Sequence, residues 1–208
     1  MTRRTVTTAV CVAVVAGVAA GCSGGPAAAP ASTSPSSPTV AALPHSGAPK
    51  VEHPLPASVL SGDPCAEALT STQLKDIIGI APQGEHKDTA GLGPSCDWHN
   101  SDAGSLVTVS YSTEVQEGLS LVYQNTKPKS QVWRVLPPIQ GFPAVAHLAI
   151  GADLQNQFCQ VSVGITDELT FEATLILGNA NRGKQDPCDL APRVADMVVT
   201  NLRQKAGS

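Results

Sequence analysis

The tripeptide Asp-Pro-Cys occurs twice in this chain, at residues 63–65 and 186–188, and no other feature restricts the fold as much. In each copy Asp can cap the start of a helix and Pro fits its first turn, so each copy predicts a helix that begins beside a cysteine. Two further cysteines, Cys96 and Cys159, lie in strand-like surroundings, 31 residues after Cys65 and 29 residues before Cys188. The pattern indicates two disulfides that join helices to strands.

Four cysteines allow three pairings. The repeated tripeptide and the similar spacings favour Cys65–Cys96 and Cys159–Cys188. The alternative, Cys65–Cys188 with Cys96–Cys159, would join the two helix starts and bridge two strands. No C-x-x-C pair is present among these cysteines, so the sequence gives no support to a redox motif or a zinc site, and we expect no metal.

The N-terminal residues have the features of a lipoprotein export signal. Arg3 and Arg4 precede an uncharged apolar stretch, residues 9–20, which is too short to span a bilayer. Small residues then lead to Cys22. This arrangement predicts a signal peptide over 1–21 and a lipid-modified Cys22, with fatty-acyl chains such as palmitate holding the protein to the extracytoplasmic face of the cell membrane. Ordinary secretory cleavage is the alternative, because the lipoprotein consensus prefers Leu where this chain has Ala19.

The mature chain divides into a tether and a domain. Residues 22–60 are rich in Ala, Pro, Ser and Thr and contain eight of the 17 prolines, which predicts a disordered linker. Residues 61–208 are long enough for one extracytoplasmic domain with its own core. Removing residues 1–21 leaves 11 basic against 17 acidic residues, a net charge of −6. Without a basic cluster, nucleic acid is not an expected partner.

Apolar periodicity predicts the elements of this domain. Alternating patterns at 105–111 and 157–165 indicate strands with one covered face, and 169–177 completes a hairpin with the second of them. Residues 70–79 fit a short amphipathic helix with a capping box, and 190–202 fit a longer terminal helix that contains Pro192. A further helix is expected from Val115, Leu119 and Val122. We therefore expect an α+β fold, a mainly antiparallel sheet with two or three helices packed on one face.

These motifs, taken in order, resemble a family of exported actinobacterial lipoproteins classified as a domain of unknown function. The matching features are the lipobox, the Pro/Ser linker, GDPC at 62–65, CDW at 96–98, GFPAV at 141–145, Cys159 and DPC at 186–188. The resemblance implies a cell-envelope location and an α+β domain. It supplies no catalytic residues.

The richest polar cluster is CDWHNSD at 96–102. Trp98, Asp97 and His99 are the candidate ligand-binding residues, and Asp97, His99 and Asp102 could also bind a cation together with Glu85 or His86 from the preceding loop. The carboxylate spacing matches neither a calcium loop nor a zinc site. A polar turn after a strand explains the same letters, so we expect no metal and no cofactor.

Other conspicuous side chains have structural explanations. Trp98 and Trp133 are the only tryptophans. We expect Trp98 to pack over the Cys96 disulfide and Trp133 to fill the core face of the sheet. His147 is expected on the polar face of a strand, without a functional role.

No common hydrolase motif, Walker-type nucleotide-binding loop or dinucleotide-binding motif is present in the chain. The sequence therefore favours a non-catalytic envelope module that binds a protein partner, a wall component or a small ligand. The alternatives are a hydrolase or other envelope enzyme with an unrecognised site, and a scaffold accessory of a membrane complex.

Overall fold

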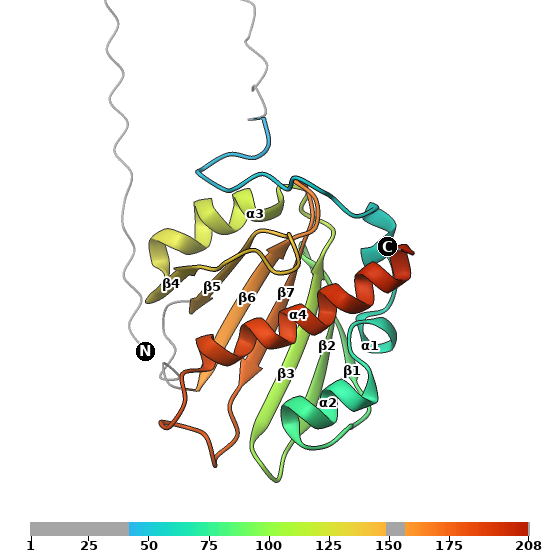
Figure 1. Cartoon of the computed structure of the whole chain (residues 1–208), viewed down its shortest axis with the longest axis vertical. Helices are drawn as coiled ribbons and strands as arrows, with labels where there is room; N and C mark the ends of the chain where they lie inside the picture. The colour runs from blue at the N-terminus through green and yellow to red at the C-terminus, as the bar shows by residue number, and fades with distance from the viewer. Residues whose placement is uncertain (1–41, 149–156, 208) are drawn as a thin grey trace, which may run out of the picture. The chain divides into compact units, whose positions relative to one another are not determined.

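The computed structural model describes residues 42–148 and 157–207, which form one antiparallel sheet with helices packed against it (Figure 1). The sheet has seven strands in the order β1-β2-β3-β7-β6-β5-β4, and every neighbouring pair is antiparallel. The strands are β1 (Glu85–Thr89), β2 (Gly93–Asn100), β3 (Ser105–Ser112), β4 (Val132–Val135), β5 (Ala144–Leu148), β6 (Phe158–Gly164) and β7 (Thr170–Ile176).

Three helices lie on one face of this sheet, as predicted. The long α4 (Pro187–Ala206) crosses β5, β6 and β7, while α1 (Pro64–Glu67) and α2 (Ser71–Ile78) pack near β2 and β3 (Figure 1). A 3-10 turn, η1 (Ala57–Leu60), also contacts α4. The predicted α+β class with a mainly antiparallel sheet is confirmed. Within the part of the chain that the structure describes, no helix combines the length and apolar character needed to cross a bilayer.

The two faces of the sheet differ because strand side chains alternate between them. On the helix-covered face, Val107, Val109, Val161, Val163 and Phe171 are fully buried and belong to the main hydrophobic core. The opposite face, here called the second face, carries mostly polar side chains. Aligned registers place the following residues across it in one row: Glu85, Asp97, Thr108, Thr174, Gln160, His147 and Trp133.

The two Asp-Pro-Cys tripeptides adopt the same local structure. Asp63 and Asp186 are the N-caps of α1 and α4, and their side chains accept hydrogen bonds from the backbone N–H of Cys65 and Cys188, at 2.9 and 2.8 Å. The predicted disulfides Cys65–Cys96 and Cys159–Cys188 are both confirmed. Each one holds the first turn of a helix to a strand on the helix-covered face.

The helix expected around Val115 begins later than predicted. The structure has α3 (Gly118–Leu121), followed by a π-helical turn, η2 (Val122–Thr126), and a 3-10 turn, η3 (Lys127–Lys129), while Val115 lies in the bend that precedes α3. This segment contacts β6 on the second face. Together with Val145, Leu119, Val122 and Tyr123 form a small cluster separate from the main core.

The folded domain also begins upstream of the boundary predicted at Ser61. Val51, Leu55, Val59 and Leu60 are buried in the main core, and the Val51 N–H donates to Asp167 Oδ1 at 2.9 Å. Prolines around these residues made the segment resemble the linker, but its four apolar side chains belong to the core of the domain. The first part of the linker predicted over 22–60, residues 22–41, lies outside the described residues, and so does the predicted anchor at Cys22.

Candidate functional site

The three predicted ligand residues do not converge, because neighbours on a strand point to opposite faces. Trp98 is only 2% exposed and packs in the main core beside the Cys65–Cys96 disulfide. Asp97 and His99 lie on the second face. Asp97 is nearly buried, and its two oxygens accept hydrogen bonds from Lys87 Nζ at 2.5 Å and Thr108 Oγ1 at 2.6 Å.

The alternative cation set is divided as well. His99 Nε2 lies 3.9 Å from both Glu85 and Asp97, so these three residues share a surface network. His86 instead faces Asp63, with Nδ1 3.1 Å from Oδ1. Cys65 comes near Asp63 and His86, but its sulfur is bonded to Cys96 and offers no thiolate to a metal.

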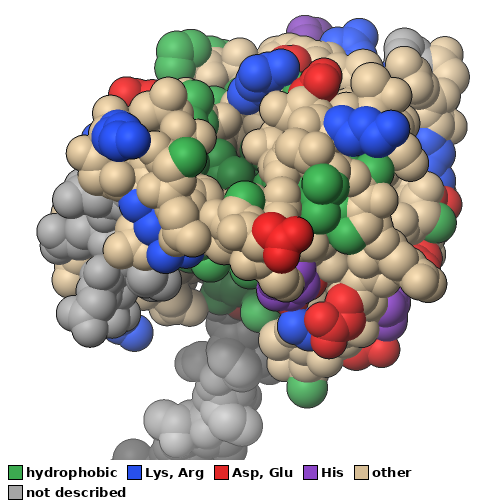
Figure 2. Space-filling view, turned by 90° about the horizontal axis from the view of Figure 1, so that it is seen from below, with side chains coloured by type: hydrophobic (Ala, Val, Ile, Leu, Met, Phe, Trp, Pro, Cys, Tyr) green, Lys and Arg blue, Asp and Glu red, His purple; other side chains and the backbone are tan. Residues whose placement is uncertain are grey.

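A large cavity opens at the end of the molecule that carries the β2–β3 and β7–α4 connections. Its volume is about 730 Å³, within the size range of small-molecule sites. Its walls come from the last turn of α2, the β2–β3 turn, the end of β7, the loop that follows it, and the start of α4. Figure 2 looks at this end and shows hydrophobic side chains set back in a hollow among polar ones. We call this space the end cavity.

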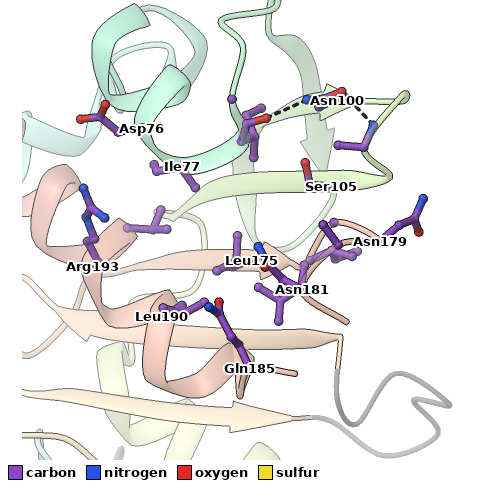
Figure 3. Close-up of a pocket in the computed structure, with 18 of the residues that line it drawn as sticks. Asp76, Ile77, Asn100, Ser105, Leu175, Asn179, Asn181, Gln185, Leu190 and Arg193 are labelled. Carbon is purple, nitrogen blue, oxygen red and sulfur yellow. Dashed lines mark hydrogen bonds between the residues drawn. The ribbon is translucent and has the colours of Figure 1, made fainter. Parts of the chain in front are cut away.

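The floor of the end cavity is apolar and its rim is polar. The floor is formed by Ile77, Ile78, Leu175, Leu177, Leu190 and Val194. On the rim, Asp76 and Arg193 lie on one side of the opening, with Asn179 and Asn181 on the other (Figure 3). The rim side chains that have no hydrogen-bond or ion-pair partner within the described residues are Asp76, Asp102, Asn179, Asn181, Gln185 and Arg193.

The frame around these free side chains is held by hydrogen bonds. Asn100 donates from Nδ2 to the Ile78 carbonyl at 2.7 Å and accepts from the Ala103 N–H at 3.1 Å, which fixes the β2–β3 turn against α2 (Figure 3). Arg182 donates to the carbonyls of Leu177 and Gly104 at 2.9 and 2.7 Å. These bonds tie the two connections together, so the rim is ordered before any ligand binds.

One wall residue is buried without satisfying its polar group. Ser105 lines the end cavity and is only 9% exposed, and its Oγ has no hydrogen-bond partner within the described structure. An unpaired buried hydroxyl costs about 1–3 kcal/mol relative to a paired one. A ligand atom in the cavity could supply the missing partner.

Two strongly perturbed titratable groups, Glu172 and His147, lie on the second face. Burial raises the pKa of Glu172, although its two oxygens accept hydrogen bonds from Ser112 Oγ at 2.6 Å and Thr170 Oγ1 at 2.8 Å. Burial lowers the pKa of His147 to about 4, so its ring is neutral at pH 7. His147 Nε2 pairs with Ser162 Oγ at 2.9 Å, and the ring stacks on Trp133 at 6.0 Å between centroids.

The sequence did not predict the end cavity or the burial of His147 and Glu172 on the second face. The end cavity is built from short polar connections, and asparagines in a connection are usual turn residues, so they carried no signal of their own. His147 was correctly placed on a strand outside the main core, but nothing local indicated that Trp133 and α3 would bury it. Trp133 packs in the smaller cluster on the second face, so its expected place on the core face was wrong. The one available signal was Glu172, an acidic residue within the apolar alternation of 169–177.

No curated protein and no solved structure shows significant similarity to this chain. A family model described as "Protein of unknown function (DUF3558)" matches residues 17–201, which is most of the sequence. The match includes every element that shapes the end cavity and the second face. The chain therefore belongs to the DUF3558 family.

Proposed function

We propose that this protein is an exported, lipid-anchored binding module whose end cavity takes a small peptide-like ligand of the cell envelope. The observation that carries this proposal is the end cavity itself, with its apolar floor and a rim of polar side chains that have no partner in the described structure. Polar side chains without internal partners contribute little to folding. Their convergence over an apolar floor is the usual composition of a ligand site.

The chemistry of the rim favours a peptide-like ligand over a simple ion. The side-chain amides of Asn179, Asn181 and Gln185 offer both donors and acceptors, which match the N–H and C=O groups of a peptide. Arg193 can bind a carboxylate, and Asp76 on the same side can accept from an ammonium or amide group. The apolar floor then accommodates an aliphatic side chain.

The export signal and the disulfides support an envelope location. Disulfides persist in oxidising compartments, and both pairs in this domain are formed. A lipid chain on Cys22 would keep the domain at the membrane surface, where peptide components of the wall, or the exposed ends of envelope proteins, are available. The acidic mature chain is consistent with ligands other than nucleic acid.

The proposal can be tested with a zwitterionic dipeptide, alanyl-leucine, and its uncharged-end analogue, alanyl-leucinamide. Titrations followed by NMR on the mature protein should place the shifted signals at the end cavity. Arg193→Gln should weaken alanyl-leucine binding roughly fivefold, the effect of an exposed charged contact near 1 kcal/mol, and leave the amide unchanged. Lys184→Gln removes the same charge from the neighbouring loop, outside the lining, and should leave both affinities unchanged.

A filled cavity gives the complementary test. Leu190→Trp adds bulk to the partly exposed floor and should abolish binding of both probes, while circular dichroism and the melting temperature show that the fold persists. If neither probe shifts any signal from the residues that line the end cavity, the peptide-ligand proposal is wrong. Equal binding to the wild type and to Leu190→Trp would place the ligand elsewhere.

A further inference from the structure

A second, smaller cavity lies on the second face, between the sheet and the α3–η2 segment. Its volume is about 240 Å³. One side is apolar and is formed by Leu92, Val115, Leu121 and Val122. The polar lining residues are Ser110, Ser112, His147, Gln160, Ser162, Thr170 and Glu172 on the strands, with Asn125 and Thr126 on η2. We call this space the second-face cavity. It is separate from the end cavity, and the two have no lining residue in common.

The second-face cavity contains a carboxyl group but no cationic side chain. Glu172 has no ion-pair partner within the described residues, and no Lys or Arg belongs to the lining. Both carboxyl oxygens already accept hydrogen bonds, from Ser112 and Thr170. Because those hydroxyl hydrogens point at the carboxyl group, the hydroxyl lone pairs are left as acceptors for a third group.

His147 adds a further unsatisfied atom. Its side chain is 3% exposed, Nε2 pairs with Ser162, and Nδ1 has no hydrogen-bond partner within the described structure. Lys127 lies over the neighbouring Tyr123 and Trp133 rings, with its Nζ 5.1 and 5.6 Å from their centroids, and it does not belong to the lining. The lining therefore combines hydroxyl and amide groups with one buried acid that lacks a counter-charge.

We propose that the second-face cavity binds a small primary ammonium compound, with its N–H donors directed at Glu172 and the surrounding hydroxyls and its carbon chain against the α3–η2 side. A primary ammonium supplies three donors and the missing positive charge. At about 30 Å³ per water-sized group the volume admits roughly eight heavy atoms, so the ligand class is a short alkylamine or the amine end of a longer molecule. An ion that lacks a carbon chain would leave the apolar side without a partner.

The π-helical turn is consistent with such a site. Single π turns cost regular hydrogen bonding and recur at functional positions. Here η2 carries Asn125 and Thr126, both of which line the cavity beside Val122. The turn thus places two polar side chains and one apolar one over the polar strands.

Ethylammonium, with ethanol as a neutral probe of similar size, tests the proposal on the full mature chain. Isothermal titration calorimetry should detect ethylammonium binding and no ethanol binding. Burial raises the pKa of Glu172, so binding should release a proton where the empty site is protonated. The affinity should then fall about tenfold per pH unit below that pKa. Heats measured in two buffers with different ionisation enthalpies give the number of protons released.

Variants locate the site. Glu172→Gln keeps the shape and removes the charge, and should lower ethylammonium affinity at least tenfold and abolish its pH dependence. Glu168→Gln removes the same charge from the exposed turn before β7 and should change nothing. Ser110→Leu fills the cavity from a half-buried position without a side-chain hydrogen bond and should also prevent binding. Equal binding of ethanol and ethylammonium by the wild type, no binding of ethylammonium, or unchanged binding by a folded Glu172→Gln protein would overturn the proposal.

Discussion

Two buried residues on the second face, His147 and Glu172, make the stability of the fold depend on pH in opposite directions. The pKa of His147 is lowered to about 4 by burial, so the folded protein holds it neutral. Between pH 6.5 and about 4 the unfolded chain therefore binds the extra proton, and stability falls as the pH falls. Burial raises the pKa of Glu172, which works the other way: the folded state keeps a proton that the unfolded chain loses, and stability falls as the pH rises through that pKa.

His147→Gln should therefore flatten the acid side of the stability profile. Gln can retain a hydrogen bond to Ser162 but does not titrate, so the stability lost by the wild type between pH 6.5 and 4, roughly 3 kcal/mol at most, should largely disappear. Urea unfolding at several pH values measures the difference in the free energy of unfolding between the two proteins. The contributions of the other titrating groups cancel in this difference. Parallel profiles for the two proteins would show that His147 titrates normally.

At the scale of elements, apolar alternation made most of the fold predictable. Strands β3, β6 and β7 and helices α2 and α4 were all recognisable, because each buries one regular apolar set. The edge strand β1 could not be recognised, since all its residues, Glu85–Thr89, are exposed and charged or polar. Such a sequence suits an unpaired edge that must not pair with another molecule. The end cavity was less predictable, because much of its lining comes from connections between elements. Residues in such connections follow no regular sequence pattern.

Each disulfide holds the start of a helix to the sheet. This support matters most for α4, because α4 contains a proline. Pro192 lies inside α4, where it cannot donate the hydrogen bond that would join it to the preceding turn. The Cys159–Cys188 bond holds that first segment to β6 at a Cα–Cα distance of 5.1 Å, and Arg134 pairs with both Asp186 and Asp189 at the same end. The disulfide and these ion pairs thus compensate for the backbone hydrogen bond that Pro192 cannot donate.

Replacing Cys159 and Cys188 together by Ser should lower the free energy of unfolding by about 2–5 kcal/mol, because a closed loop of about 30 residues is released. Chemical denaturation measures the loss. Pro192→Ala in the same background should recover part of it, since alanine restores a helical N–H donor. A change below about 1 kcal/mol in the double Ser variant would mean that packing of α4, and not the disulfide, fixes its start.

For the whole molecule, the proposed lipid anchor at Cys22 predicts that this one residue holds the protein at the membrane. The lipobox predicts that metabolic labelling with an alkyne fatty acid marks the wild-type protein and that Cys22→Ser loses the label and moves to the soluble fraction. The unfolding free energy of the domain should not change, because the described core residues begin only at Val51. A Cys22→Ser protein that remains in the membrane fraction would contradict lipid anchoring at this position.

The extent of the folded unit gives the last prediction. Val51, Leu55, Val59 and Leu60 are at most 9% exposed, and burying each such side chain stabilises a fold by about 1.5–3 kcal/mol, as an upper estimate. A domain of this size has a total stability of only about 5–15 kcal/mol. A chain that begins at Ser61 should therefore be largely unfolded, whereas one that begins at Val40 should melt like the mature protein. Thermal unfolding of the two truncations, with Cys65–Cys96 and Cys159–Cys188 formed in both, measures the contribution. Equal melting temperatures would show that residues 51–60 only cover the core and that the domain is complete from Ser61.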